Sequence, residues 1–521
     1  MQALEAFENT YTKDNNVFFV IAPKNGNVFT RETLAAVKEL TEASWKMPHS
    51  SRVDSIANFQ HTRAEEDDLI VEDLVQNTES LSKEDLKRIQ QIALSEPLLV
   101  NRLISPSGHV TGVNVMILLP GESIKEVPEV AAFARKLADD FRKQYPGIDV
   151  YLAGGVMADN AFGEASQDDM STLIPAMFLT LIIIVGLTLR SFMGTFTTLI
   201  IILISMLSGM GLAGWLRISI TSASVNAPTI ILTLAVADSV HILSTMFHQM
   251  HLGKTKHQAI AESLRVNLQP VFLTSATTAI GFLSMNFSDA PPFRDLGNIV
   301  AMGVMAAFVY SILFLPALMA ILPVRLKLKA ESNYWTCNRL ADFVIRRRKL
   351  VFWGTLVVIV VLGAGTLRIE LNDNFIKYFD ESYDFRRASD FVEQNLTGLD
   401  VIEYSLDSGE PGGINNPEYL ATVEAFANWY RTQPKVAHVN TITETMKRLN
   451  KNMHGDDGSF YRIPEQRDLA AQYLLLYEMS LPFGLDLNNQ INVDKSATRM
   501  TVTVRDMTCL LYTSPSPRDR S

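Results

Sequence analysis

Cysteine is almost absent from this sequence. Only Cys337 and Cys509 occur among the 521 residues, which excludes a disulfide framework and any cysteine-based metal site. The first residues lack the basic and apolar regions of a signal peptide. No stretch has the spacing of a nucleophile triad, a phosphate-binding loop or a metal site. The sequence therefore predicts no enzyme, no cofactor and no metal.

Positive charge is scarce in the first third of the chain. The protein has a net charge of −10, and residues 1–170 contain 16 Lys and Arg against 27 Asp and Glu. Such an acidic domain disfavours nucleic acid or anionic lipid headgroups as its partner. Its hydrophobic periodicity predicts an α+β aqueous domain. The expected strands are Val17–Ala22, Arg52–Phe59, His109–Leu119 and Ile148–Leu152, and the expected helices are Arg31–Ser44, Ser82–Leu94 and Val127–Gln144.

Long apolar runs dominate the middle of the sequence. Hydrophobic residues make up 47% of the chain, too few for a protein that consists of membrane helices alone. A helix that crosses a bilayer needs about 20 predominantly apolar residues. We therefore expect a membrane bundle together with aqueous domains. The six candidate runs are Leu173–Leu189, Phe196–Leu216, Ala227–Phe247, Pro270–Phe287, Leu296–Leu322 and Leu350–Leu367.

Lysine and arginine are unevenly distributed between the short loops that connect these runs. The loops on one side contain twelve of them, whereas the loops on the other side contain only Arg217 and Arg294. Because cytoplasmic loops are rich in positive charge, the first side is predicted to be cytoplasmic and the acidic domain to lie outside. The basic run Arg346–Lys349 fits a positive-inside anchor better than a nucleic-acid site.

One acidic residue lies inside the third apolar run. Asp238 is the twelfth residue of Ala227–Phe247, which places it near the middle of a spanning helix. A carboxylate at that depth is costly unless a partner, water or a proton compensates it, and such groups usually mark ion or proton pathways. His241 follows three residues later and is expected on the same helical face. The sequence predicts a transporter built around a proton-binding aspartate.

Purely structural roles are also open to these polar residues. Asp238 fits the cap of a broken half-helix or a buried helix of a large soluble protein, although the other apolar runs favour the membrane. A lone histidine is often structural, and Ser239 fits packing or a hydrogen bond to its own helix. Thr274, Thr277 and Thr278 form one hydroxyl-bearing stripe, which fits the lining of a proton path and fits helix packing equally well.

The pattern of the first domain recurs after the sixth run. Shifts of 384 to 389 residues align several apolar positions in the same order along the chain. Internal repeats are a known feature of transporters, so we expect a tandem duplication of helix, outer domain and helix bundle. The aligned pairs include Phe7 with Phe391, Leu34 with Leu420, Val53 with Val439 and Val115 with Val504.

Three motifs of the bundle are ILTLAVADSVHIL, LQPVFLTSATTAIGFLSMNFSDAPPFRDLG and SILFLPALMAILP. Together with the domain order they resemble the resistance-nodulation-division (RND) superfamily, most closely its MMPL-type, sterol-sensing-domain-like exporters, over residues 1 to about 507. The resemblance implies that Asp238 translocates protons. Leu234 and Ser239 replace the glycine and tyrosine of the common Gly-x-x-x-Asp-Tyr pattern, so that His241 is the candidate for the second member of the relay.

The resemblance also implies an architecture and a function. The architecture is an α-helical membrane bundle plus α+β periplasmic porter domains, a tandem-duplicated RND permease that is incomplete at both ends. The function is proton-driven export of hydrophobic, amphiphilic or lipid-like compounds across the bacterial inner membrane. Alternatives are a sterol- or lipid-sensing protein without pumping and a proton-driven helper of protein export. Substrate, protons and membrane are the implied partners, nucleic acid is not, and a homo-oligomer or a periplasmic adaptor stays open.

These predictions divide the chain into six segments, and Met1 is expected to be internal to a longer reading frame. The last segment is rich in proline, serine and arginine and looks like translated vector sequence. The segments are a first porter domain (1–170), a bundle of five helices (171–322), a basic cytoplasmic linker (323–349), a helix that opens the second repeat (350–367), a truncated second porter domain (368–507) and the non-native tail (508–521).

Overall fold

The structure is a computed structural model that describes residues 7–8, 10–11, 15–65, 68–123, 125–221, 223–324, 335–369 and 374–505. The predicted tail, residues 508–521, lies outside the described residues. The chain divides into two compact units. One, here named the aqueous unit, consists of Met1–Ser166 and Ala364–Ser521, and the other, the membrane unit, consists of Gln167–Gly363.

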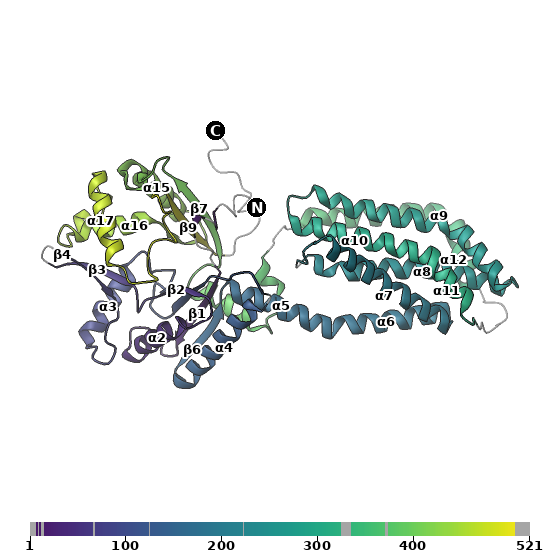
Figure 1. The fold of residues 1–521 in the computed structure, drawn as a ribbon, viewed down its shortest axis with the longest axis horizontal. Helices are drawn as coiled ribbons and strands as arrows, with labels where there is room; N and C mark the ends of the chain where they lie inside the picture. Colours follow the sequence, from purple (N-terminus) through teal and green to yellow (C-terminus); the bar gives the residue numbers. More distant parts are fainter. Residues whose placement is uncertain are drawn as a thin grey trace. The chain divides into compact units, whose positions relative to one another are not determined.

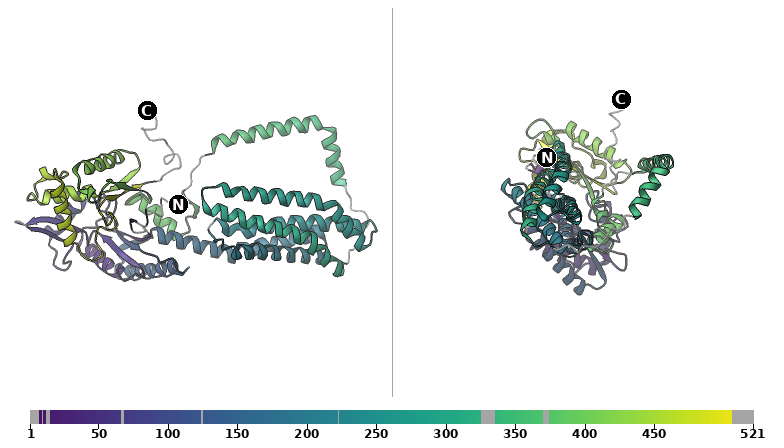
Figure 2. Two further views of the ribbon diagram at one scale, coloured as in Figure 1. Left: turned by 45° about the horizontal axis from the view of Figure 1, so that its top comes forward. Right: turned by 90° about the vertical axis from the view of Figure 1, so that its right-hand side faces the viewer.

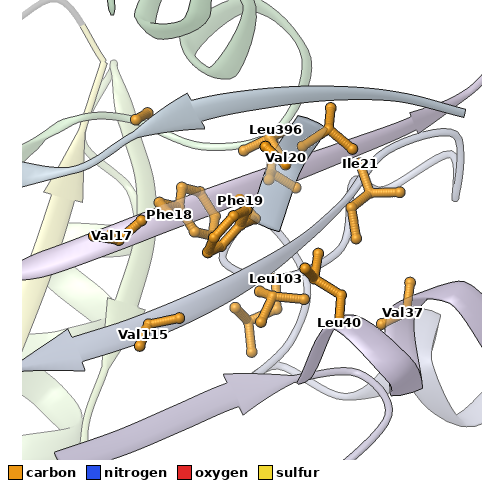
Figure 3. Packing of buried hydrophobic residues seen from close by; sticks show 14 of the residues in the cluster. Val17, Phe18, Phe19, Val20, Ile21, Val37, Leu40, Leu103, Val115 and Leu396 are labelled. Atoms are coloured by element: carbon orange, nitrogen blue, oxygen red, sulfur yellow. The ribbon is translucent and has the colours of Figure 1, made fainter. Parts of the chain in front are cut away.

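An antiparallel sheet of four strands is the centre of the first half of the aqueous unit (Figure 1). Its order is β2 (Ser50–Ser55), β5 (Thr111–Ile117), β1 (Asn16–Pro23) and β6 (Ile148–Ala153). Val17–Ile21 of β1 are all buried, whereas a sheet with one wet face would bury only alternate residues. Both faces of this sheet are therefore covered. Figure 3 shows Leu396, from the second half of the unit, beside Val20.

The helices of this half follow the predicted boundaries closely. Helix α2 (Arg31–Ser44) begins where expected, and the side chain of Thr30 accepts a hydrogen bond from the backbone N–H of Thr33. Helix α3 (Lys83–Ser95) begins with a capping box, in which Ser82 and Asp85 exchange side-chain to backbone hydrogen bonds. Helix α4 (Glu126–Gln144) also agrees with its prediction, whereas α5 (Gly155–Ser171) was not predicted.

A polar hairpin in this half was not predicted. Strands β3 (Gln60–Glu65) and β4 (Asp68–Asp73) pair with each other and with no other described strand. Leu69 and Val71 pack against the hydrophobic core of the second half. The side chain of Thr62 donates to Asn452 Oδ1 over 2.6 Å. The hairpin is therefore an arm that joins the first half to the second.

The second half contains a three-stranded sheet with the order β7 (Asp400–Asp407), β9 (Ala497–Val504) and β8 (Val436–Asn440). Read from β8 to β7, this order corresponds to β2-β5-β1 of the first sheet. Helix α15 (Pro417–Arg431) lies between β7 and β8 in the sequence, as α2 lies between β1 and β2. The other helices are α14 (Asp384–Asn395), α16 (Ile442–Asn452) and α17 (Arg467–Ser480).

The two halves exchange the segments that precede their first strands. Helix α14 precedes β7 yet packs against β6, where the ring of Phe391 stacks on Tyr151 with 4.0 Å between centroids. In the opposite direction, the Phe7 ring precedes β1 and lies 5.1 Å from the guanidinium of Arg499 on β9. Tyr11 forms a 3.2 Å hydrogen bond with Ser405 of β7. Each half therefore completes its core with a segment of the other.

The membrane unit contains six helices of the described chain that are long and apolar enough to cross a membrane. Helix α10 contacts α7, α8 and α9, which lie side by side in Figure 1. Gly209 allows close packing here, because a Cβ at this position would lie 3.0 Å from the Cα of Gly303. In the six spans α5 continues into α6 and α10 into α11, and α12 belongs to none of them. The helices of this unit are α6 (Leu173–Leu189), α7 (Phe192–Trp215), α8 (Ala227–His251), α9 (Lys256–Leu283), α10 (Pro291–Val309), α11 (Leu315–Ile321), α12 (Trp335–Arg346) and α13 (Arg348–Ala364).

Two prolines of the bundle have different effects. Pro270, where the fourth apolar run was expected to begin, lies inside α9, and the helix extends back to a capping box at Thr255. Pro316, in the fifth run, lies two residues after a π-helical turn over Tyr310–Phe314. Because proline has no N–H, Pro316 cannot bond the carbonyl of Ile312 four residues earlier. The run is therefore interrupted before Pro316.

Candidate functional site

Asp238 lies inside the membrane bundle. Helix α8 begins at Ala227, and Asp238, twelve residues along it, is only 6% exposed. Helix α8 contacts α7, α9 and α10, so that Asp238 is surrounded by protein. In the described part of the chain its carboxylate forms no ion pair. The hydroxyl of Ser275 donates a 3.2 Å hydrogen bond to its Oδ2.

Ser275 belongs to a buried stripe of α9 that was not predicted from the sequence. The buried residues of this helix recur every four positions, and Ser263, Asn267 and Ser275 are the polar members. The hydroxyl of Ser263 donates to the carbonyl of Ile242 on α8 over 2.6 Å, and Asn267 Nδ2 donates to the carbonyl of Ser263 over 2.9 Å. The spacing of four residues was the available signal. This stripe connects α9 to α8 along the side of Asp238.

The predicted threonine stripe has a different orientation. Thr274 and Thr277 are exposed in the described structure, and Thr278 is half-buried. Each hydroxyl bonds a carbonyl of its own helix, with Thr277 donating to Leu273 over 2.7 Å and Thr278 to Thr274 over 2.7 Å. The structure brings the neighbouring Ser275 to Asp238 and does not bring these three threonines there.

The two polar residues that follow Asp238 are also separated from its carboxylate. Ser239 is fully buried, and its hydroxyl donates to the carbonyl of Ala235 over 2.8 Å, which is the helix-backbone bond that its sequence position permits. His241 is exposed on α8. Among the described residues no hydrogen bond joins Ser239 or His241 to Asp238, and their part in a relay stays a prediction.

The π-helical turn adds further polar groups to the bundle interior. The hydroxyl groups of Tyr310 and Ser208 lie 2.8 Å apart and link this turn to α7. Ser311 is fully buried, and its hydroxyl has no hydrogen-bond partner within the described structure. The turn contacts both α7 and α8. Because π-turns frequently accompany functional sites, this segment is a second polar feature of the bundle beside the surroundings of Asp238.

The aqueous unit contains a cavity of about 450 Å³ between its four-stranded sheet and its three-stranded sheet. One part of its wall is apolar and comes from both halves of the unit. Phe18 on β1 and Met116 on β5 contribute from the first half, and Phe375, Ile376 and Phe385 contribute from the second. A cavity of this size and lining fits a hydrophobic molecule or the chain of an amphiphile.

The remaining wall of this cavity is polar. Arg499 and Glu403 form an ion pair there, with 3.1 Å between Nε and Oε1. Three lining atoms, His438 Nε2, Asn440 Oδ1 and Asn489 Oδ1, are buried without a hydrogen-bond partner among the described residues. Buried polar atoms usually have partners. The cavity therefore has one apolar wall and one wall with hydrogen-bonding groups that lack a partner. These two walls suit the apolar part and the polar part of an amphiphilic ligand.

His438 makes the stability of the aqueous unit depend on pH. Its Nδ1 lies 3.1 Å from the carbonyl of Val100, and burial together with the charge of Arg102 lowers the pKa of His438 to about 3. In the unfolded chain the imidazole of His438 binds a proton near pH 6.5. The contribution of neutral His438 to the free energy of unfolding is therefore fully present above that pH and decreases as the pH falls toward 3. At pH 5 the expected loss is about 2 kcal/mol relative to pH 7.

Denaturant unfolding of the protein in detergent at pH 7 and pH 5 measures this loss. The variant His438→Gln can still donate to Val100 but does not titrate, so its stability should change less between the two pH values. His257→Gln, at an exposed position of the membrane unit, should retain the dependence of the native protein. An unchanged dependence in His438→Gln would contradict the assignment.

The described residues contain no group of three or more histidine, cysteine, aspartate or glutamate side chains that could hold a metal ion. The buried polar groups of the bundle are instead hydroxyls, an amide and one carboxylate. The hydroxyls and the amide form hydrogen bonds, and the carboxylate is the one group among them that can be charged. The candidate site is therefore the buried carboxylate of Asp238 in the membrane unit, and the aqueous unit adds a cavity with apolar and polar walls.

This chain is similar in sequence to several transport proteins. The transport protein MmpL12 of Mycobacterium tuberculosis, described as probable, is 21% identical over 343 residues, which cover 63% of this chain and 29% of that protein. The heme uptake protein MmpL11 of the same species is 22% identical over 221 residues (40% and 23%). The sulfolipid-1 exporter MmpL8, also from M. tuberculosis, is 23% identical over 254 residues (48% and 22%).

The chain thus spans less than a third of the length of these three relatives. A family model supplies the assignment independently of any one of them. The MMPL family model matches residues 1–366, which include the first half of the aqueous unit and all of the membrane unit. Six described helices are long and apolar enough to cross a membrane. The chain therefore belongs to the MMPL family and is a multi-pass membrane protein.

Proposed function

We propose that this chain is part of a proton-driven RND-type exporter of hydrophobic, amphiphilic or lipid-like compounds. The burial of Asp238 in the bundle, where Ser275 donates a hydrogen bond to it, carries the proposal. A carboxylate in a membrane interior is costly while it is charged, and binding a proton removes that cost. Asp238 can therefore be charged or protonated, and the relative free energies of these two states depend on the proton concentration. Coupling of transport to a proton gradient requires such a dependence.

The cavity of the aqueous unit supports a substrate with both apolar and polar parts. Its aromatic wall suits a hydrocarbon or ring system, and His438, Asn440 and Asn489 offer hydrogen bonds to a headgroup. The relatives named for a sulfolipid and for heme handle amphiphilic molecules of different shape. We propose that the substrate of this protein belongs to the same broad class.

The arrangement of the strands supports a tandem duplication. The order β8-β9-β7 corresponds to β2-β5-β1, and the helix after the first strand occupies the same place in both halves. We propose that the two halves are porter domains of a duplicated permease. By the distribution of positive charge they lie in the periplasm of a bacterium, and the membrane unit lies in its inner membrane.

Transport in proteoliposomes tests the proposed function. The complete reading frame that contains this sequence is reconstituted with a fluorescent lipid or another amphiphile inside the vesicles, and a pH gradient is imposed. Efflux of the amphiphile should accompany proton movement in the opposite direction, and an ionophore that collapses the gradient should stop both.

The same assay separates the alternatives. A sterol- or lipid-sensing protein would bind the amphiphile without moving it or protons. A proton-driven helper of protein export would pass protons without moving the amphiphile. Exchange of lipid that does not depend on the pH gradient would contradict the proton-driven mechanism. Transport into the vesicle lumen when the gradient is reversed would determine the direction in which substrate moves relative to protons.

A further inference from the structure

Helix α12 (Trp335–Arg346) presents a polar and an apolar face, and its side chains from Arg339 to Arg346 are exposed in the described structure. Leu340, Phe343 and Val344 lie at helical spacing on one side and are 63%, 53% and 43% exposed. Asp342 and Arg346, four residues apart, form a polar face beside it. Exposure of an apolar helix face of this size to water is unfavourable. We therefore expect α12 to lie against a surface that has an apolar part for one face and a polar part for the other.

The position of α12 in the chain specifies that surface. Helix α13 begins at Arg348, two residues after α12 ends, and the segment Arg348–Arg368 is long and apolar enough to span a membrane. The turn between the two helices is tightly connected, because the backbone N–H of Arg347 donates to Phe343 and its carbonyl accepts from Val351. Where α13 enters the bilayer, α12 therefore lies at the bilayer surface.

The orientation of α12 agrees with this position. Figure 2 shows α12 turning away sharply, so that it runs across the axis of α13. A helix that crosses the axis of a spanning helix runs along the membrane plane. In this orientation its apolar face can enter the hydrocarbon boundary while its polar face stays in the headgroup region.

The charge of the segment selects a type of headgroup. Arg346, Arg347, Arg348 and Lys349 are four consecutive cations, all exposed, and Asp342 is the only acidic residue between Arg339 and Lys349. Long cationic side chains can reach from a helix at the surface to lipid phosphates. Clusters of Lys and Arg next to a spanning helix are attracted to anionic lipids.

We propose that α12 and the basic turn Arg346–Lys349 form a membrane-surface anchor that binds the headgroups of anionic phospholipids. This anchor is independent of the proton-driven function, because it uses neither Asp238 nor the cavity of the aqueous unit. Its occupant is the lipid surface itself. A second protein segment on the same face would shield it from lipid and from water alike, which labelling can detect.

Site-directed labels test the position of the helix. In a protein with Cys337 and Cys509 replaced by serine, a cysteine is introduced at Val344 or at Asp342 and labelled with an environment-sensitive fluorophore. The protein is reconstituted in phosphatidylcholine vesicles with about one third phosphatidylglycerol. The label at position 344 should be quenched by spin-labelled lipid, and the label at position 342 by aqueous iodide.

Spin-labelled phosphatidylglycerol and phosphatidylcholine measure the headgroup preference by electron spin resonance. The native protein should prefer phosphatidylglycerol by about threefold or more at low salt, and high salt should weaken the preference. The triple variant Arg346→Gln, Arg347→Gln, Arg348→Gln should lose it. Arg368→Gln, a matched change at the other end of the same span, should retain it.

Three results would overturn the anchor. Quenching of the label at position 344 by iodide would place α12 in water. Protection of that label from both quenchers would show that protein covers the apolar face. Equal association of the two lipids with the native protein, or unchanged selectivity in the triple variant, would remove the anionic headgroup as the ligand.

Discussion

Replacement of Asp238 by Asn should reduce gradient-driven transport to the level of protein-free vesicles. Asparagine has nearly the same volume as aspartate and can accept the hydrogen bond of Ser275, so the bundle should still assemble. It cannot bind and release a proton, and the neutral side chain fixes one of the two states that coupling requires. The measurement is substrate efflux together with internal pH in proteoliposomes.

Insertion to equal levels must be verified for each variant in this assay. Thr180→Val serves as a matched control, because the Thr180 hydroxyl is exposed and bonds its own helix at the carbonyl of Ala176. Transport by Thr180→Val should equal that of the native protein. Undiminished proton-coupled transport by Asp238→Asn would remove Asp238 from the mechanism. Binding of the amphiphile without transport, equal in the native protein and in Asp238→Asn, would instead agree with a lipid-binding protein that tolerates a neutral isostere.

Replacement of Arg448 by Met should destabilise the aqueous unit by about 3 kcal/mol. Arg448 on α16 is buried at the junction of the two halves, and its Nη1 lies 3.5 Å from Oε2 of Glu96 in the first half. Its guanidinium also lies 5.1 Å from the ring centre of Phe59 and donates to the hydroxyl of Tyr477. Methionine preserves much of the packing but leaves the carboxylate of Glu96 largely buried without its partner.

Denaturant unfolding in detergent measures this effect, and two further variants identify its cause. The double variant Arg448→Met, Glu96→Gln should recover part of the loss, because no unpaired charge remains. Arg467→Met removes the exposed ion pair of Arg467 with Glu410 and should cost about 1 kcal/mol or less. Equal losses in Arg448→Met and Arg467→Met would show that the buried pair does not hold the halves together.

The sequence predicted the spanning helices well because apolar length is a strong local signal. Helix α6 has the predicted bounds, and α8 extends the predicted run by four residues. The beginning of α9 was placed too late, because Pro270 and the polar residues before it resemble a helix start. The structure continues α9 through Pro270. A proline inside a helix can be accommodated when neighbouring helices pack around it.

Features that depend on distant contacts were not readable in the same way. The β3–β4 hairpin is polar along its length, and its apolar residues Leu69 and Val71 contact a core whose residues lie more than 340 positions later. The sequence near the hairpin therefore did not indicate which surface its apolar residues pack against. Ser275 was overlooked because the neighbouring threonines are more conspicuous, although only the buried spacing of four residues identifies the face toward α8.

The exchange of α14 with the segment around Phe7 also governs how the aqueous unit can form. The core of the first half contains Phe385, Val392 and Leu396, which are synthesised more than 200 residues after the sheet they cover. All of the spanning helices in the described chain lie between these two pieces. The core of the first half therefore stays incomplete while the bundle is inserted into the membrane. It can be completed only after α14 has been synthesised and lies on the same side of the membrane.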